Sequence, residues 1–259
     1  MRVSETGDIS FVVYGYMNSD EHEGMAGSAV YHYNAERNVM QEELFIPSSS
    51  SYQSLKQNLS VLSYVSTQDQ LYMYMEGNLY QVDLASGSYK ILKDQISSDC
   101  FVISRSQASV AWMDEMDENH SSHITAMSLE SGETLRVSAP EGQKIKALGF
   151  INEDLIYGMA NDADIQNDAA GNVIFAMNKL NIQNFNGTVI KDYQQDGIYV
   201  TEVNIQEGLL ELKRAVKENE VFVSAADDHI MNNLMDHEET VTTKPVSYTH
   251  LTLPTTSRV

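Results

Sequence analysis

The chain has 259 residues, of which 42% are hydrophobic, and its formal net charge at pH 7 is −21. An apolar share of this size can bury a core, which excludes a disordered acidic tail. The negative charge argues against duplex nucleic acid and anionic membrane surfaces as partners, because both are bound through cationic protein surface.

No apolar run approaches the length of a membrane span, so we expect no membrane insertion by this segment. The first eleven residues lack the charged-then-apolar pattern of a signal peptide and read as mid-domain sequence. We therefore expect the natural protein to continue before Met1. Cys100 is the only cysteine, which excludes an intrachain disulfide and a thiolate metal site. It precedes the apolar run FVIS, so we interpret it as a small buried hydrophobic residue.

Short alternating strands separated by turn residues occupy most of the chain, and helical periodicity is hard to find. In chain order, the pattern predicts strands or two-stranded hairpins at Arg2–Ser4, Ile9–Tyr16, Tyr33–Phe45 (hairpin), Val61–Val65, Leu71–Met75, Val82–Leu92 (hairpin), Phe101–Arg105, Ser109–Met113, Met127–Val137 (hairpin), Lys146–Ile151, Leu155–Met159, Leu180–Tyr193 (hairpin), Ile198–Ile205, Leu209–Val216, Glu220–Ala225 and, less well defined, His229–Asn233.

The hairpins repeat. VDLASGSYKIL and MSLESGETLRV both read as strand, Ser-Gly turn, strand, and Gly87 and Gly132 can supply the positive φ of a tight turn. Asn186-Gly187 marks a third such turn. Two further strands precede each hairpin, which gives units of four antiparallel strands that we label A to D. Four-stranded units that recur along the chain are typical of a β-propeller, whereas a jelly roll or sandwich does not repeat one hairpin in this way. We predict an all-β fold, a partial β-propeller of about five four-stranded antiparallel blades, over residues 1–245.

Asp8, Asp69 and Asp154 stand before the B strands, and the hairpins quoted above end each unit. This pattern resembles the propeller repeats of Tol-associated proteins and of the N-terminal domains of prolyl oligopeptidases. The resemblance covers residues 1 to about 225. WD, kelch and sialidase repeat motifs do not occur in the sequence. In the prolyl oligopeptidases the catalytic domain is a separate one, and none of its motifs occurs here.

Three predicted B–C loops are long and acidic, and propeller geometry would bring them to one face. They are MNSDEHEGMAG (Met17–Gly27), DEMDENHSS (Asp114–Ser122) and ANDADIQNDAAGN (Ala160–Asn172). The candidates for a binding face are Asp20, Glu21, His22, Glu23, Asp114, Asp117, Glu118 and His120. The candidates for metal ligands are Asp162, Asp164 and Asp168.

A rim formed by these three acidic loops has three interpretations. It could bind calcium, which takes many oxygen ligands from loops, although the third loop lacks the glycine and distal glutamate of an EF-hand. It could dock a basic protein or peptide. Its acids could also do no more than keep the loops solvated. His22 and His120 are too isolated in sequence to indicate a zinc site. Like-charge crowding predicts raised carboxylate pKa values on these loops, unless a cation or basic partner relieves it.

No phosphate loop, serine elbow or zinc-protease motif occurs, so we predict no catalytic residues and no cofactor. The run Ser48–Ser51 reads as a polar linker between blades. We expect a non-catalytic binding or scaffold module within a larger bacterial protein. The alternative is the propeller portion of a hydrolase or peptidase whose catalytic part lies elsewhere. Acidity, low cysteine content and the repeat pattern favour an extracytoplasmic or membrane-anchored location.

The last fourteen residues, VSYTHLTLPTTSRV (residues 246–259), resemble a translated transposon-end adapter from sequencing libraries. Their alternation also fits an edge strand. We expect a non-native tail, outside the fold, and a natural chain that continues differently beyond residue 245.

Overall fold

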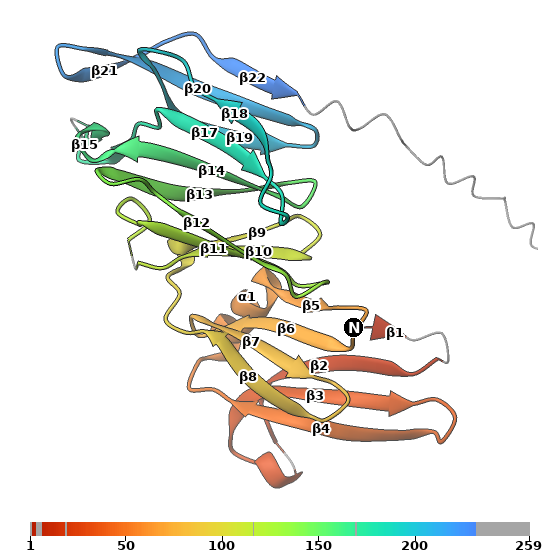
Figure 1. The fold of residues 1–259 in the computed structure, drawn as a ribbon. Helices are drawn as coiled ribbons and strands as arrows, with labels where there is room; N and C mark the ends of the chain where they lie inside the picture. The colour runs from red at the N-terminus through yellow and green to blue at the C-terminus, as the bar shows by residue number, and fades with distance from the viewer. Residues whose placement is uncertain (1, 4–6, 19, 116, 169, 232–259) are drawn as a thin grey trace, which may run out of the picture.

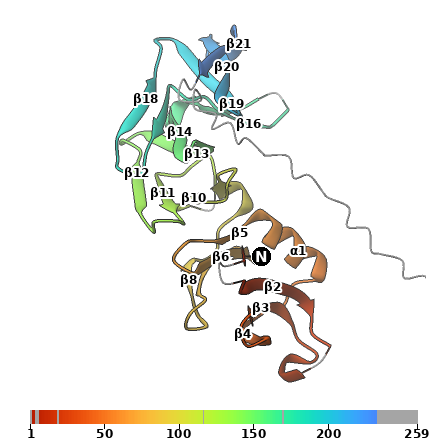
Figure 2. The same ribbon diagram turned by 90° about the vertical axis from the view of Figure 1, so that its right-hand side faces the viewer.

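Five four-stranded sheets follow one another along the chain in the computed structural model, which describes residues 2–3, 7–18, 20–115, 117–168 and 170–231. Every strand pair within them is antiparallel. The sheets lie side by side as an open arc, with the first and last at opposite ends (Figures 1 and 2). The chain is thus an all-β partial propeller, as the repeat predicts. The predicted tail, residues 246–259, lies outside the described residues.

The blades are numbered in chain order, and each of the first four follows the strand order A, B, C, D. Blade 1 comprises β1 (Arg2–Val3), β2 (Ile9–Tyr16), β3 (Ala26–Asn34) and β4 (Val39–Pro47). Blade 2 comprises β5 (Ser63–Val65), β6 (Gln70–Met75), β7 (Asn78–Asp83) and β8 (Ser88–Lys93). Blade 3 comprises β9 (Phe101–Ile103), β10 (Ser109–Met113), β11 (His123–Ser128) and β12 (Thr134–Ser138). Blade 4 comprises β13 (Gln143–Ile151), β14 (Asp154–Asn161), β17 (Lys179–Gln183) and β18 (Val189–Tyr193), with the small hairpin β15 (Ile165–Asn167) and β16 (Val173–Phe175) inserted. Blade 5 comprises β19 (Ile198–Gln206), β20 (Leu209–Glu218), β21 (Val221–Ser224) and β22 (Asp228–Met231).

The B strands of the three middle blades are apolar on both sides because each belongs to two blade interfaces. In β6, Leu71, Met73 and Met75 pack toward blade 1, whereas Tyr72 and Tyr74 pack toward blade 3. The same alternation divides β10 and β14 between their two neighbours. Successive side chains of a strand point to opposite faces of the sheet, so one B strand contributes to two interfaces. The result is four successive apolar clusters, one between each pair of neighbouring blades.

Cys100 is buried in the cluster between blades 3 and 4, as predicted, and burial is the main reason that the pKa of its thiol is raised. The B-strand aromatics Trp112 and Tyr157 are buried in the clusters between blades. Tyr16, by contrast, is exposed at the end of β2.

One α-helix, α1 (Tyr52–Val61), was not predicted from the sequence and connects blade 1 to blade 2. Ser51 caps it by accepting a hydrogen bond from the backbone N–H of Ser54. Leu55 and Leu59, four residues apart on one face, are buried against blades 1 and 2. The expected strand Val61–Val65 is correspondingly shorter, because Val61 ends the helix and β5 begins at Ser63. No helix in the described ranges is long and apolar enough to cross a membrane.

Blade 5 corrects a second prediction. His229–Asn233 was expected to form its fourth strand. Instead, β21 and β22 both pair with β20, one after the other along its length, so together they occupy the position of the third strand. A bulge at residues 225–227 separates them. Within the described residues, blade 5 therefore has strands A, B and C, and the outer edge of β21 and β22 has no strand beside it.

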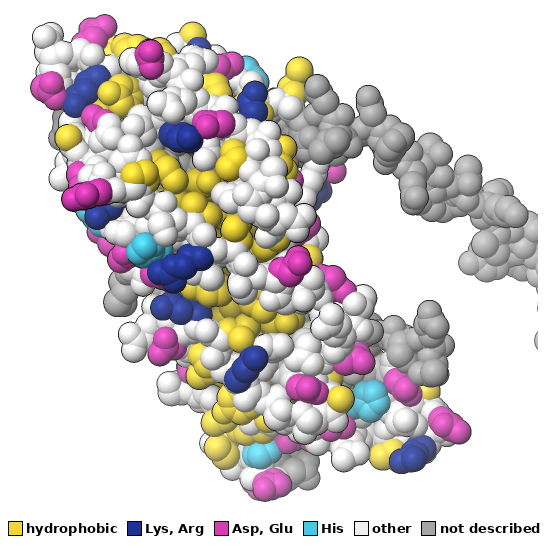
Figure 3. Space-filling view, viewed as in Figure 1, with side chains coloured by type: hydrophobic (Ala, Val, Ile, Leu, Met, Phe, Trp, Pro, Cys, Tyr) yellow, Lys and Arg dark blue, Asp and Glu magenta, His cyan; other side chains and the backbone are white. Residues whose placement is uncertain are grey.

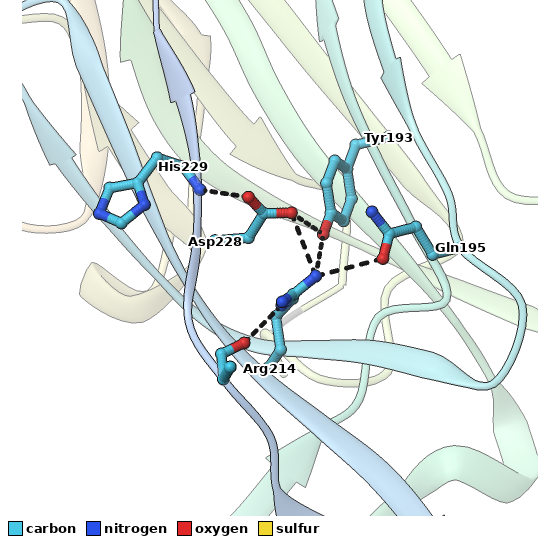
Figure 4. A network of polar contacts seen from close by, with 6 residues as sticks. Tyr193, Gln195, Arg214, Asp228 and His229 are labelled. Carbon is cyan, nitrogen blue, oxygen red and sulfur yellow. Dashed lines mark hydrogen bonds and ion pairs between the residues drawn. The ribbon is translucent and has the colours of Figure 1, made fainter.

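A polar network around Arg214 secures this bulge (Figure 4). The Arg214 guanidinium donates to the carbonyl of Ala226 at 2.7 Å and pairs with Asp228 at 3.1 Å. It also donates to the hydroxyl of Tyr193, on the last strand of blade 4, at 3.2 Å. The pKa of Asp228 is lowered, first by the backbone N–H of His229 and then by the Tyr193 hydroxyl. We interpret the network as structural, because its groups bind one another and tie blade 5 to blade 4.

Candidate functional site

The three long acidic loops lie at one end of the strands, as the B–C topology predicts. They join β2 to β3, β10 to β11, and β14 to β17. Because each loop follows a B strand and precedes a C strand, all three leave the same end of their blades. We call residues 17–25, 114–122 and 162–178 the acidic loop face. On the surface seen in Figure 3, by comparison, Asp and Glu side chains are dispersed around a broken hydrophobic band.

In the first loop, Asp20–His22 form a 3₁₀ turn whose histidine folds back onto blade 1. The Nε2 atom of His22 lies 2.7 Å from Oε1 of Glu42, and its ring stacks on Phe45 with centroids 4.0 Å apart. His22 is thereby held against the sheet. The side chains of Glu21 and Glu23 are exposed.

The second loop is held by its own hydrogen bonds. Glu115 accepts from the Ser121 hydroxyl and, at 3.0 Å, from the backbone N–H of Ser122. Asp117 accepts from the backbone N–H of Asn119 at 2.9 Å and lies 2.7 Å from Nδ1 of His120. These carboxylates therefore fix the conformation of the loop and also contribute to its negative charge.

Two candidate acids of the second loop pair with cations. Glu118 bridges blades, because its carboxylate lies 2.8 Å from Nζ of Lys146 on β13 of blade 4. Asp114 pairs with Arg136 of its own blade at 2.8 Å. Part of the acidity of this loop is therefore neutralised by blade packing.

The third loop does not bring its three candidate metal ligands together. Asp164 is buried and pairs with Lys217 of blade 5 at 3.0 Å, while Asn161 donates to its other oxygen at 2.8 Å. Asp168 accepts the backbone N–H groups of Ala170 and Asn172 and so closes the turn between β15 and β16. Asp162 is exposed. In the part of the chain that the structure describes, no group of three or more His, Cys, Asp or Glu side chains could hold a metal ion.

The expected rise in carboxylate pKa on this face is wrong for three of its acids. The pKa of Asp117 is lowered, first by the Asn119 N–H and then by His120. The pKa of Asp168 is lowered by the side chain and backbone of Asn172. Burial tends to raise the pKa of Glu115, but hydrogen bonds from Ser121 and Ser122 outweigh it and the pKa is lowered. Hydrogen bonding to the charged form therefore outweighs like-charge crowding.

A second concave surface lies at the opposite end of the strands, where A–B turns meet. A hollow of about 620 Å³ there includes Arg105, Ser106, Glu153 and Glu207 among its lining residues. These residues were not predicted as a site from the sequence. The available signal was the pair Asn152-Glu153, which places glutamate where a tight hairpin turn favours glycine.

No family model matches the sequence, and no curated protein matches it. Among solved structures, the chain is similar to the β-propeller domain of the trilobed protease from Pyrococcus furiosus, at 10% identity and a TM-score of 0.37, over 86% of this chain and 68% of that one. It is similar to the tricorn protease at 12% identity and a TM-score of 0.37, over 85% of this chain and 23% of that one. It is similar to dipeptidyl peptidase 4 from Porphyromonas gingivalis at 12% identity and a TM-score of 0.32, over 86% of this chain and 45% of that one. The chain thus spans less than half the length of the last two, and the propeller assignment follows from its own sheet topology.

Proposed function

We propose that this propeller is a non-catalytic binding or scaffold module, and that its acidic loop face docks a basic protein or peptide. One observation carries the proposal: three long acidic loops from blades 1, 3 and 4 leave the same end of the strands. The module would belong to a larger bacterial protein outside the cytoplasm or anchored to a membrane.

Two further features support this use of the face. Hydrogen bonds keep the pKa values of Glu115, Asp117 and Asp168 low, so these charges persist in mildly acidic solution. Lys146 and Lys217 neutralise Glu118 and Asp164 of this face, and the exposed Glu21, Glu23 and Asp162 remain to attract a partner. Fixed charge of one sign steers a partner of opposite charge and accelerates its association.

The test is binding of fluorescent hexalysine to the full 259-residue chain, measured by anisotropy at increasing salt. The double variant E21Q/D162N neutralises exposed acids of two loops of the acidic loop face. The control E36Q/E133Q changes the net charge equally, at exposed C–D turns on the other end of the strands.

Docking at the acidic loop face predicts weaker binding for E21Q/D162N, with a difference that shrinks as salt screens the charges. The control should bind like the wild type. Equal loss in both double variants would mean that net charge alone attracts the peptide and would overturn the proposal. The peptidase-portion alternative would be favoured instead if the natural gene were found to encode a serine elbow in a further domain.

A further inference from the structure

The hollow at the other end of the strands has a definite chemistry. It lies where the A–B turns of blades 3, 4 and 5 converge, and the β13–β14 and β19–β20 turns form two of its walls. Its lining is part apolar and part charged. The lining residues are Arg105, Ser106, Phe150, Ile151, Asn152, Glu153, Ile205, Gln206, Glu207 and Gly208.

Glu153 has one carboxylate oxygen that the protein leaves without a partner. Its Oε1 atom accepts a hydrogen bond from the Ser106 hydroxyl at 2.7 Å. Its Oε2 atom is buried and has no hydrogen-bond partner. A buried acceptor of a charged group is costly to leave unpaired, and such atoms are rare in folded proteins. The protein therefore gives this carboxylate one hydrogen bond, from the Ser106 hydroxyl, and leaves its second oxygen unpaired.

The backbone also carries a strained residue here. Asn152 and Glu153 have φ values of 47° and 65°, so both central residues of the turn are left-handed. A two-residue turn of the same backbone shape, Glu76-Gly77 between β6 and β7, has glycine at its second position. Asn219-Glu220 has the same sequence and the same left-handed backbone as Asn152-Glu153, but its glutamate pairs with Lys217 at 2.8 Å. Glu220 thus supplies a matched control for Glu153.

The charge balance in the hollow favours a cation. Arg105 pairs with Glu207 at 3.0 Å, which leaves the carboxylate of Glu153 as the uncompensated charge among the lining residues. The pKa of the adjacent Asp154 is raised by burial and then by the charge of Glu153. A ligand with one positive charge would balance the lining.

We propose that the hollow binds an alkylammonium group, which pairs with the carboxylate of Glu153 while its aliphatic stem lies against Phe150, Ile151 and Ile205. A lysine side chain of a peptide and a free aliphatic amine share this chemistry. The site is separate from the acidic loop face, because it lies at the opposite end of the strands.

The test uses the full chain and three small probes in titrations followed by NMR: Nα-acetyl-lysine-N-methylamide, its uncharged norleucine analogue, and butylamine. We expect the lysine probe to bind on the order of tenfold or more tightly than the norleucine probe, because the ammonium makes a charge-assisted hydrogen bond. Binding of butylamine as tight as that of the lysine probe would point to free amines, and binding of the lysine probe alone would point to a peptide.

The variant E153Q should lose the preference for the lysine probe, whereas E220Q should keep it. Because E153Q also removes an unpaired buried charge, its melting temperature should equal or exceed that of the wild type. Equal affinity of the wild type for the lysine and norleucine probes would overturn the proposal without any variant. A destabilised E153Q with no probe binding by the wild type would also overturn it, since Glu153 would then serve only to hold Ser106.

Discussion

Asp164 shows how one carboxylate of an acidic loop can serve packing more than surface charge. It is buried, its two oxygens are occupied by Lys217 and Asn161, and the lysine reaches it from the next blade. The pKa of Lys217 is raised, first by its hydrogen bond to Glu220 and then by its hydrogen bond to Asp164. Replacing all three aspartates of the third loop by asparagine would therefore weaken the contact between blades 4 and 5 as well as remove surface charge.

We expect D164N to destabilise the chain by about 2 kcal/mol, because it breaks a buried, charge-assisted contact between blades 4 and 5. D162N is the matched control, two residues away in the same 3₁₀ turn, with an exposed side chain. It should change the free energy of unfolding by less than about 0.5 kcal/mol. Urea denaturation of both variants measures the difference, and equal effects would contradict this role for Asp164.

Glu76 gives a pH dependence with a defined sign. Burial tends to raise its pKa, but hydrogen bonds from Ser48, Ser49 and Ser50 prevail, and the pKa is lowered from 4.5. A lowered carboxylate pKa stabilises the fold above the unfolded value, and that contribution is lost as the pH falls through the folded pKa.

We therefore expect E76Q to be less stable than the wild type at pH 7, by about 1 kcal/mol after allowance for partial exposure. Between about pH 5 and about pH 3 its stability should fall less steeply than that of the wild type, because one titrating group is gone. Denaturation at a series of pH values measures both slopes. Parallel curves would show that Glu76 does not contribute to acid sensitivity.

At the scale of elements, the C–D hairpin is the repeated unit, yet its copies differ in their surroundings. Gly87 and Gly132 occupy the same turn position with φ values of 64° and 76°. A Cβ atom on Gly87 would lie 2.6 Å from the carbonyl oxygen of Glu43 in blade 1, whereas one on Gly132 would meet nothing within 4 Å.

G132A should cost about 1 kcal/mol, the strain of a left-handed alanine. G87A should cost at least about 2 kcal/mol, because the strain is joined by a clash that separates blades 1 and 2. Thermal unfolding of the two variants checks the order. A larger loss for G132A would show that the turn and not the blade contact limits stability.

The sequence predicted the elements whose signals are local. Strand alternation and the glycine turns located most strands, and SVAWM was placed at its observed bounds, Ser109–Met113. The helix α1 was missed because it is short and its leucines also fit an alternating strand. The partners of Asp164 and Glu118 could not be predicted, since both are lysines from the next blade. The bulge that brings β22 into line with β21 along β20 could not be predicted either, because it depends on the tertiary network around Arg214.

At the scale of the whole molecule, the open arc leaves an outer edge at blade 5. In the described part of the chain, no strand lies beyond β21 and β22, and their exposed side chains include Val221, Val223 and Met231. An uncovered apolar edge strand is a template for pairing with another chain.

We expect the 259-residue chain to self-associate as its concentration rises, and V223K to reduce this association, because lysine on an edge strand discourages edge pairing. Sedimentation velocity over a range of concentrations measures both. As a control, Glu133 lies on the exposed C–D turn of blade 3, away from this edge, and E133K should associate like the wild type. A wild-type chain that sediments as a monomer throughout would contradict the expectation.

The four apolar clusters between neighbouring blades also determine where the molecule should open first. A middle blade is held by two clusters and an end blade by one, so local opening is cheapest at the two ends. In hydrogen–deuterium exchange, amides of β6, β10 and β14 should therefore be protected longest, and those of β2 and β20 should exchange sooner. Exchange at one common rate in all five B strands would mean that the arc opens as a single cooperative unit.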